Sequence, residues 1–170
     1  MNEKEQLAWS SFMPALMACV ASTSGCVLEL GVGHFSTPTL HAICGASNRY
    51  LLSVEQNKEW LSKFEKLKTD GHSFWGLGYD EMLDNLPKFG QRWGVAFIDN
   101  SPGGARRAKD FLALIKTSDF VIVHDYWQDN EEHIAPLLKN VKYTHVTRTH
   151  EPPTLVASLD RPIPSSIIQL

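Results

Sequence analysis

The stretch CVLELGVGHFSTPTL, Cys26 to Leu40, decides how the chain is interpreted. A short apolar run ends in Glu29 and leads into Gly31-Val32-Gly33, and Ser36 then opens a helix-like segment. Glycines at such a corner let the backbone turn sharply and let a ligand approach closely. In open α/β sheets, ligands bind at the carboxyl ends of the strands. The stretch therefore predicts a ligand site at this glycine corner, Gly31 to Gly33, with the carboxylate of Glu29 beside it.

The residues around the glycine corner favour a cationic ligand. A dinucleotide site would have the pattern Gly-x-Gly-x-x-Gly, but Ser36 stands at the third glycine position. Glu29 would repel a pyrophosphate at contact distance, whereas it would attract the ammonium and sulfonium groups of S-adenosylmethionine. The alternative for Glu29 is a carboxylate that caps a backbone amide or faces solvent.

A second carboxylate, Glu55, ends the next apolar run, 24 positions after Gly31. This is close to the offset of about 20 residues at which an acidic residue reaches a ribose diol. Its two oxygens suit two neighbouring hydroxyl groups. The alternative is an exposed acid that precedes a helix.

The rest of the chain alternates apolar runs with amphipathic ones. Apolar strands are predicted at 27–30, 49–55, 72–78, 93–99 and 119–125, with helices between them. This pattern indicates a parallel sheet covered on both faces. Residues 143–149 and 154–160 are two further strands, and the link HEPP between them is too short for a crossover helix, so they pair antiparallel. The predicted fold class is α/β: a Rossmann-like three-layer sandwich whose mostly parallel, seven-stranded sheet ends in an antiparallel hairpin.

The N-terminal segment has apolar residues at helical spacing, including Trp9, Phe12 and Leu16, and Pro14 bends or breaks that helix. We expect residues 1–23 to form a helical lid or cap and residues 24–170 to form a single cofactor-binding domain. The 170 residues are 43% hydrophobic and 21% charged, as in an ordinary globular protein.

The composition also limits compartment and partners. A net charge of −3 does not favour nucleic acid or an anionic membrane surface. The N-terminus lacks the cationic start of a signal peptide, and no apolar run approaches the roughly 20 residues of a membrane helix. The three cysteines lie in apolar surroundings, which suggests reduced core residues. The prediction is a soluble cytoplasmic protein.

Over residues 24–160 the chain resembles the class I S-adenosylmethionine-dependent methyltransferases. The resemblance rests on LELGVGHFST, LLSVE, GYDEML, VAFIDNSPG, FVIVHD and the closing hairpin. It is strongest for the small-molecule O-methyltransferase-like branch, whose members often have IDG at the fourth strand and HD or DD at the fifth. The resemblance implies that the cofactor contacts the following residues: Glu29, Gly31 and Gly33 at its methionine end, Glu55 at its ribose, Gly78, Tyr79 and Asp80 at its adenine, and Asp99 near its sulfur.

Methyl transfer to a hydroxyl requires an aligned nucleophile and removal of its proton. The candidates end the fourth and fifth strands. Asp125 is the preferred base, with His124 as an alternative because imidazole titrates near neutrality, and Asp99 completes the catalytic set. Strand alternation would place His124 and Asp125 on opposite faces, so that only one faces the reaction centre. The predicted substrate contacts are Tyr126, Trp127 and Asn100.

A divalent cation such as Mg²⁺ stays an open alternative. In metal-dependent catechol-type relatives, two aspartates and a following asparagine hold the ion; Asp99 and Asp125 match, but Tyr126 stands in place of the asparagine. Asn100 or Asp129 would have to substitute for it. Arg106-Arg107 is interpreted as a solvated helix face rather than as a contact for an anionic substrate.

The predicted function is therefore an S-adenosylmethionine-dependent methyltransferase acting on a small molecule, at a hydroxyl oxygen. Two alternatives stay open: a protein that binds S-adenosylmethionine without transferase activity, and, less favoured, an NAD-dependent oxidoreductase. The expected partner is a small-molecule acceptor, without nucleic acid or membrane. A homo-oligomer, which would supply a further pocket wall, also stays open.

Overall fold

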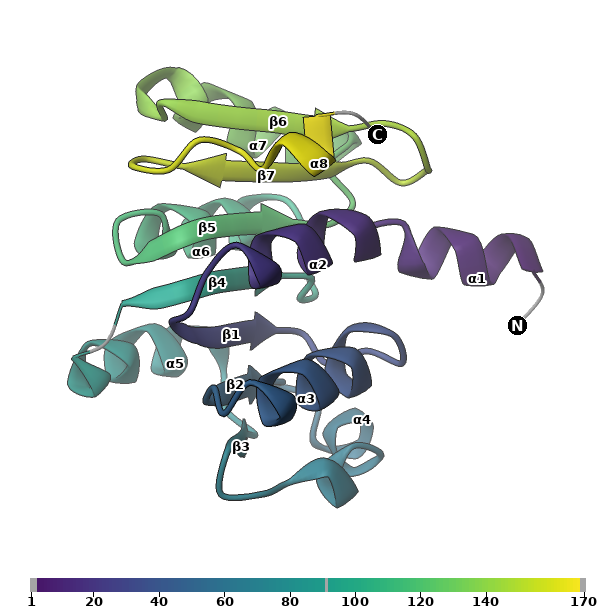
Figure 1. Ribbon diagram of the computed structural model, residues 1–170, viewed down its shortest axis with the longest axis vertical. Helices are drawn as coiled ribbons and strands as arrows, with labels where there is room; N and C mark the ends of the chain where they lie inside the picture. Colours follow the sequence, from purple (N-terminus) through teal and green to yellow (C-terminus); the bar gives the residue numbers. More distant parts are fainter. Residues whose placement is uncertain (1–2, 91, 169–170) are drawn as a thin grey trace.

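The computed structural model describes residues 3–90 and 92–168. Its centre is a seven-stranded sheet of order β3-β2-β1-β4-β5-β7-β6 (Figure 1). The strands are β1 (Cys26–Leu30), β2 (Leu51–Val54), β3 (His72–Trp75), β4 (Trp93–Ile98), β5 (Ser118–Val123), β6 (Tyr143–Thr147) and β7 (Thr154–Ser158). The first five run parallel, whereas β7 is antiparallel to both β5 and β6. The predicted fold class is confirmed.

Helices cover both faces of the sheet (Figure 1). On one face lie α2 (Met13–Ala21), α3 (Ser36–Ala46) and α8 (Ser165–Ile168), which bury Leu16, Leu40 and Ile167. On the other lie α5 (Tyr79–Asn85), α6 (Ala105–Leu114) and α7 (Gln128–Ile134), which bury Met82, Phe111 and Ile134. Because both faces are covered, strand segments such as 120–123 are apolar throughout.

The N-terminal helix is split at Ser11–Phe12 into α1 (Glu3–Ser10) and α2. Pro14 lies in the first turn of α2, where its missing N–H leaves no bond unmade. α2 packs on the sheet, whereas α1 extends beyond the carboxyl ends of the parallel strands (Figure 1). The division into a lid of residues 1–23 and a domain of residues 24–170 stays a prediction, and residues 1–2, 91 and 169–170 of it lie outside the described residues.

3₁₀ turns continue several of the helices. α4 (Lys58–Ser62) is followed by η1 (Glu65–Leu67), α5 by η2 (Leu86–Phe89) and α7 by η3 (Ala135–Asn140). Pro87 and Pro136 lie in the first turns of η2 and η3. Each lacks the N–H that would continue the α-helical ladder, so the helix ends there.

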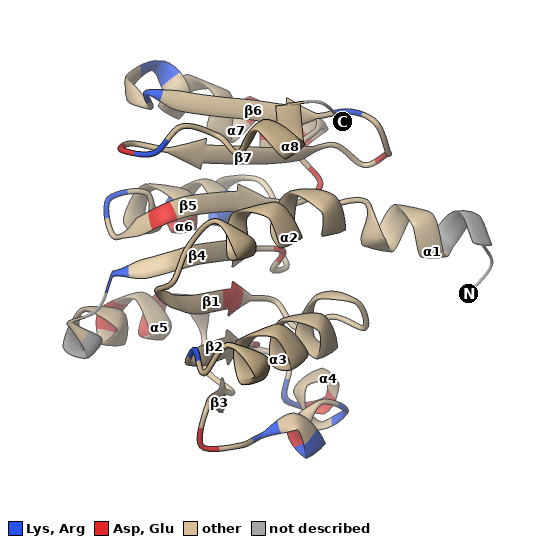
Figure 2. Ribbon diagram, viewed as in Figure 1, with Lys and Arg blue, Asp and Glu red and all other residues tan. Residues whose placement is uncertain are grey.

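Charge is distributed unevenly over the layers. Between Glu5 and Arg49, the sequence contains one charged side chain, Glu29. Figure 2 accordingly shows α2 and α3 without Lys, Arg, Asp or Glu. Over the described residues, no helix combines the length and the apolar character that crossing a bilayer requires.

Candidate active site

A cavity of about 840 Å³ lies at the carboxyl edge of the parallel strands. The glycine corner, α3 and Trp60 of α4 form one side. The ends of β4 and β5 with Arg107 of α6 form another, and α1 and the β6–β7 turn also line the cavity. Five of the predicted site residues line it: Gly33, Asp99, His124, Asp125 and Trp127. The others lie outside its lining: Glu29, Gly31, Glu55, Gly78, Tyr79, Asp80, Asn100 and Tyr126.

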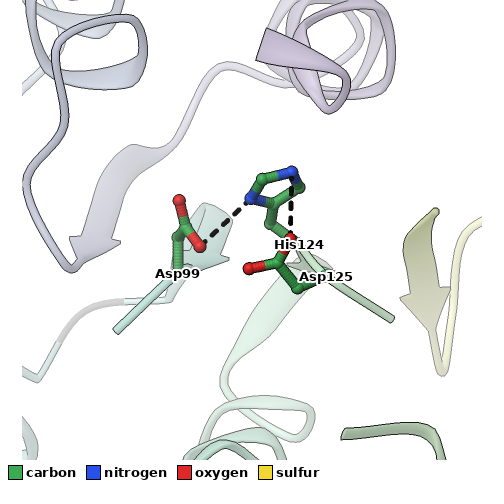
Figure 3. Close-up of side chains that lie close together, drawn as sticks. All are labelled: Asp99, His124 and Asp125. Carbon is green, nitrogen blue, oxygen red and sulfur yellow. Dashed lines mark hydrogen bonds and ion pairs between the residues drawn. The ribbon is translucent and has the colours of Figure 1, made fainter. Parts of the chain in front are cut away.

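The ends of β4 and β5 bring Asp99, His124 and Asp125 together (Figure 3). His124 Nδ1 lies 3.1 Å from Asp99 Oδ1, and His124 Nε2 lies 3.6 Å from Asp125 Oδ1. The expectation that strand alternation would separate His124 from Asp125 is wrong. β5 ends at Val123, and Asp125 adopts a left-handed backbone with φ of 53°, so both side chains turn toward the cavity.

Arg107, on α6, lies beneath this cluster and is 6% exposed, so its interpretation as a solvated helix residue is wrong. Its guanidinium lies 3.1 Å from Asp99 and 3.7 Å from Asp125, and it donates to the backbone carbonyls of Asn100 and His124. Burial raises the pKa of the Asp125 carboxyl, and Asp99 adds to this, while His124 and Arg107 act in the opposite direction. Arg107 therefore holds the two carboxylates beside one another.

His124 is also fixed by the N-terminal segment. Its Nε2 lies 3.0 Å from Ser11 Oγ, and the single hydroxyl proton of Ser11 is donated to the carbonyl of Pro152 at 2.8 Å. Nδ1 faces Asp99 Oδ1, which also accepts from Arg107. Both ring nitrogens of His124 therefore face hydrogen-bond partners within the protein, and neither is free to take a proton from an acceptor molecule.

Ser11, His124 and Asp99 thus form a hydrogen-bonded series of the serine-hydrolase type. Ser11 is only 7% exposed and lies outside the lining of the cavity. Its hydroxyl proton is held by Pro152, away from His124. The series therefore positions His124 and does not present a nucleophile.

Asp99, His124 and Asp125 could each offer one ligand atom to a metal ion, and these atoms lie within 4.8 Å of one another. Metal ligands must be deprotonated and free of competing cations. Here Arg107 pairs with both carboxylates, and both nitrogens of His124 face hydrogen-bond partners. Of the two substitutes for a third ligand, Asp129 lies outside the cluster, and the Asn100 amide donates to Asp110. The donor set fits a divalent cation poorly.

The glycine corner has a different structure from the predicted one. Gly31 has φ of 88°, and a Cβ there would lie 2.5 Å from the carbonyl oxygen of Asp99. Its lack of a side chain therefore serves packing against the end of β4. Glu29 is fully buried behind Gly33, where its carboxylate accepts from Thr37 at 2.9 Å and from Ser53 at 2.5 Å. Its charge acts on the cavity through space.

Of the residues predicted around the ribose and adenine, Glu55 and Tyr79 are buried, whereas Gly78 and Asp80 are exposed. Glu55 is 8% exposed and accepts from the backbone N–H of Asn57 at 2.8 Å. Tyr79 is buried, and the exposed Asp80 pairs with Lys109 and Arg106 on α6. Of the substrate candidates, Asn100 donates to Asp110, and Tyr126 is buried in the core.

Several residues that line the cavity were not assigned to it from the sequence. They are Leu7, Ala8, Trp9, Phe12, Phe35, Trp60 and residues 149–152 of the β6–β7 turn. The turn could have been found, because a strand antiparallel to β5 must begin at the carboxyl edge of β5. Leu155 of β7 indeed pairs with Val123 at the end of β5. His34, in the glycine corner, lines the cavity and packs on Trp60.

Comparison with known proteins gives the fold. No protein-family model matches the chain, and no match is found among curated proteins. Two similar solved structures are "a putative sam-dependent methyltransferase from Streptococcus mutans", with TM-score 0.57, and "a putative methyltransferase complexed with SAH", with TM-score 0.56. Each is 10% identical to this chain, and each alignment covers 88% of this chain but 48% of the other. The chain thus spans about half the length of these proteins and shares the methyltransferase fold with them.

Proposed function

We propose that the protein binds S-adenosylmethionine and transfers its methyl group to a hydroxyl oxygen of a small molecule. One observation carries the proposal. A cavity at the carboxyl edge of a methyltransferase-type sheet joins the glycine corner to a cluster of Asp99, His124 and Asp125. One of the similar structures is described as complexed with SAH, the product of such a transfer.

The charges around the cavity support a cationic cofactor. Three carboxylates line it, those of Asp99, Asp125 and Glu151, against one guanidinium, that of Arg107. Arg107 is already paired with two of these carboxylates, so little positive charge is available for a phosphate. Glu29 adds a fourth carboxyl group behind Gly33. Coulomb attraction in such a site favours an ammonium and a sulfonium over a diphosphate.

We assign the methionine end of the cofactor to Gly33 and the adjoining part of the cavity. When bound, S-adenosylmethionine supplies a methyl group on a positively charged sulfur. The adenosine half is assigned to Glu55 and Tyr79. To admit it, the loops after β2 and β4 must part, because Gln56 Nε2 donates to the carbonyl of Ser101 at 2.7 Å between them.

Asp125 is the proposed general base. Its side chain is 35% exposed and lines the cavity. Burial raises its pKa, which makes the carboxylate a stronger proton acceptor than an exposed aspartate. Asp125 would accept the proton of the acceptor hydroxyl, and S-adenosylmethionine, when bound, would supply the methyl group by cleavage of its sulfur–methyl bond and leave as S-adenosylhomocysteine. Arg107 and His124 keep Asp125 oriented, and Trp127 forms part of the wall for the acceptor.

We further propose that this reaction does not use a divalent cation at the cluster. The Arg107 guanidinium already supplies the positive charge that an ion would bring to Asp99 and Asp125. Activity that is unchanged by EDTA and by added Mg²⁺ is the expected result. Loss of activity in EDTA that Mg²⁺ restores would contradict the proposal.

The test is a binding measurement followed by a product measurement. Isothermal titration calorimetry with S-adenosylhomocysteine, with NAD⁺ as the control ligand, should give binding for the first alone. Incubation with S-adenosylmethionine and a panel of phenols, alcohols, acids and amines should then form S-adenosylhomocysteine with a hydroxyl compound. Tight binding without turnover on any acceptor would favour the binding protein without activity. Binding of NAD⁺ alone would refute the proposal.

A further inference from the structure

A chain of hydrogen-bonded side chains connects the buried carboxylate of Glu29 with α3 and β3. Glu29 Oε2 lies 2.5 Å from Ser53 Oγ, and Ser53 Oγ lies 3.0 Å from His72 Nε2. His72 Nδ1 in turn lies 3.1 Å from Nδ1 of His41. Glu29, Ser53 and His72 are buried, whereas His41 is half-buried. Ser53, His72 and His41 do not line the cavity, so the proposed reaction does not use them directly.

The hydrogen atoms in this series of side chains have two arrangements in which every hydrogen bond is made. With Glu29 ionised, His41 donates through Nδ1 to His72, His72 donates through Nε2 to Ser53, and Ser53 donates to Glu29. With Glu29 protonated, every bond is retained and reversed: Glu29 donates to Ser53, Ser53 to Nε2 of His72, and Nδ1 of His72 to His41. The conversion takes up one proton at Nε2 of His41 and delivers one to Glu29, so the protons balance.

This series of hydrogen bonds continues from Glu29 to the glycine corner. Thr37 Oγ1 donates to Glu29 Oε1 at 2.9 Å and accepts from the backbone N–H of Gly33 at 2.9 Å. Gly33 lines the cavity. A single residue, Thr37, therefore connects the titrating carboxyl group of Glu29 to the glycine corner.

The surroundings of Glu29 place its titration near neutrality. Burial raises its pKa to about 7, hydrogen bonds from Ser36, Ser53 and Thr37 oppose the rise, and Asp99 adds to it. Burial lowers the pKa of His72 to about 4, and His41 adds to this, so His72 is a neutral relay with one ring proton. Among the described residues, Cys44 of α3 also interacts with Glu29, and burial raises its pKa to about 11, which keeps it neutral.

We propose that His41, His72 and Ser53 are positioning residues that relay a proton between solvent and Glu29, so that the charge behind the glycine corner follows pH. The relay is a property of the free protein. Its consequence for binding rests on the proposed function: the ionised form attracts the sulfonium of S-adenosylmethionine, and the protonated form does not. S-adenosylhomocysteine has no sulfonium, so the ratio of the two affinities reports the charge.

The relay is tested first without any cofactor. In protein labelled with ¹⁵N-histidine and ¹³C-glutamate, NMR spectra follow the tautomer of His72 and the Glu29 carboxyl between pH 5.5 and 8.5. We expect Glu29 to titrate near neutrality and His72 to change from the Nδ1–H to the Nε2–H tautomer over the same range. A single His72 tautomer throughout, or a Glu29 that keeps one protonation state, would overturn the proposal. Glu29→Gln identifies the Glu29 signal.

The second test measures both ligands by calorimetry at pH 6 and pH 8. We expect the ratio of S-adenosylmethionine to S-adenosylhomocysteine affinity to rise about tenfold, the equivalent of one pKa unit. In His72→Phe the protonated arrangement would leave the Ser53 hydroxyl without an acceptor, so protonation of Glu29 is disfavoured and the ratio changes less with pH. Ser53→Ala breaks the same chain with a smaller side chain, and His145→Phe, on the far-edge strand β6, is the matched control.

The two failures are distinguishable. If neither ligand binds, the proposed function fails, and the NMR titration alone decides the relay. If both ligands bind but His72→Phe and Ser53→Ala keep the pH dependence of the wild type, the relay is refuted while the proposed function stands.

Discussion

Replacing Glu29 by glutamine should stabilise the free protein, and increasingly so as the pH rises. The native pKa of about 7 lies above the ordinary value of 4.5, because the carboxyl group is fully buried. A carboxyl whose pKa is raised by folding contributes stability that is complete below the unfolded value and is lost as pH rises through the folded value. Linkage with these two values gives a loss of about 1.4 kcal/mol at pH 5.5 and about 3.3 kcal/mol at pH 8.

Glutamine at position 29 stays neutral at every pH and avoids this loss. Its amide can accept from Thr37 and donate to Ser53, as the protonated acid would. Any fixed cost of the amide is the same at all pH values, so the informative quantity is the change with pH. Urea unfolding of both proteins should give a difference in the free energy of unfolding that grows by about 2 kcal/mol between pH 5.5 and pH 8. Glu132→Gln, an exposed site, is the control. A difference that stays constant with pH would refute a buried Glu29 that titrates near neutrality.

Three further substitutions test the general base, the contact of Ser11 with His124, and the glycine corner. Asp125→Asn should lower the rate of S-adenosylhomocysteine formation about 100-fold or more, with the affinity for S-adenosylmethionine nearly unchanged, because only proton removal is lost; an active variant would exclude Asp125 as the base. Ser11→Ala should lower the free energy of unfolding by about 1–2 kcal/mol, since His124 Nε2 and the Pro152 carbonyl both lose the Ser11 hydroxyl. Full stability in chemical denaturation would mean that these contacts are not made. Gly31→Ala should lower the free energy of unfolding by about 3 kcal/mol or more, because φ is 88° and the new Cβ meets Asp99. Gly45→Ala is the control, because its Cβ meets nothing within 4 Å, and thermal melts should show no loss of stability.

The sheet was predictable because its strands are buried on both faces. A short run such as 120–123 has no polar residue and therefore lacks the polar face of an amphipathic helix. Its pattern indicates a strand that is buried on both faces. The hairpin followed from the shortness of the link between β6 and β7. Helix lengths were less predictable. Pro87 and Pro136 both lie in segments whose apolar residues have helical spacing. At each proline the α-helix changes into a 3₁₀ helix rather than into a loop.

The site was predicted in part, for reasons that can be traced to single residues. The proximity of Asp99 and His124 was predictable because the carboxyl ends of neighbouring parallel strands meet. Arg107 was missed because an adjacent pair of arginines on an amphipathic helix resembles a solvated face, and only the tertiary structure reveals that α6 turns Arg107 inward and leaves Arg106 to pair with Asp80 and Asp110. Ser11 was missed because the contact spans 113 positions in sequence, and no local pattern encodes it.

The burial of Glu29 could have been inferred. Residues alternate between the faces of a strand, so Glu29 shares its face with Val27, and both faces of β1 are covered. Its partner across the ladder is Ser53, the one polar residue of β2. A serine facing a glutamate inside two apolar strands is a pairing that the sequence displays once the register is known.

The position of Glu29 reconciles its burial with the proposed preference for a cation. With a pKa of about 7, half of the molecules carry the charge at pH 7, so completing its ionisation on binding costs only about 0.4 kcal/mol, which is RT ln 2. At pH 6 the same step costs about 1.4 kcal/mol. Since no other Lys, Arg, Asp or Glu lies between residues 6 and 48, no opposite charge on this layer cancels the field of Glu29. A positively charged ligand at the glycine corner therefore gains the attraction of a buried carboxylate that it never touches, whereas a phosphate group there would favour the protonated form and gain nothing.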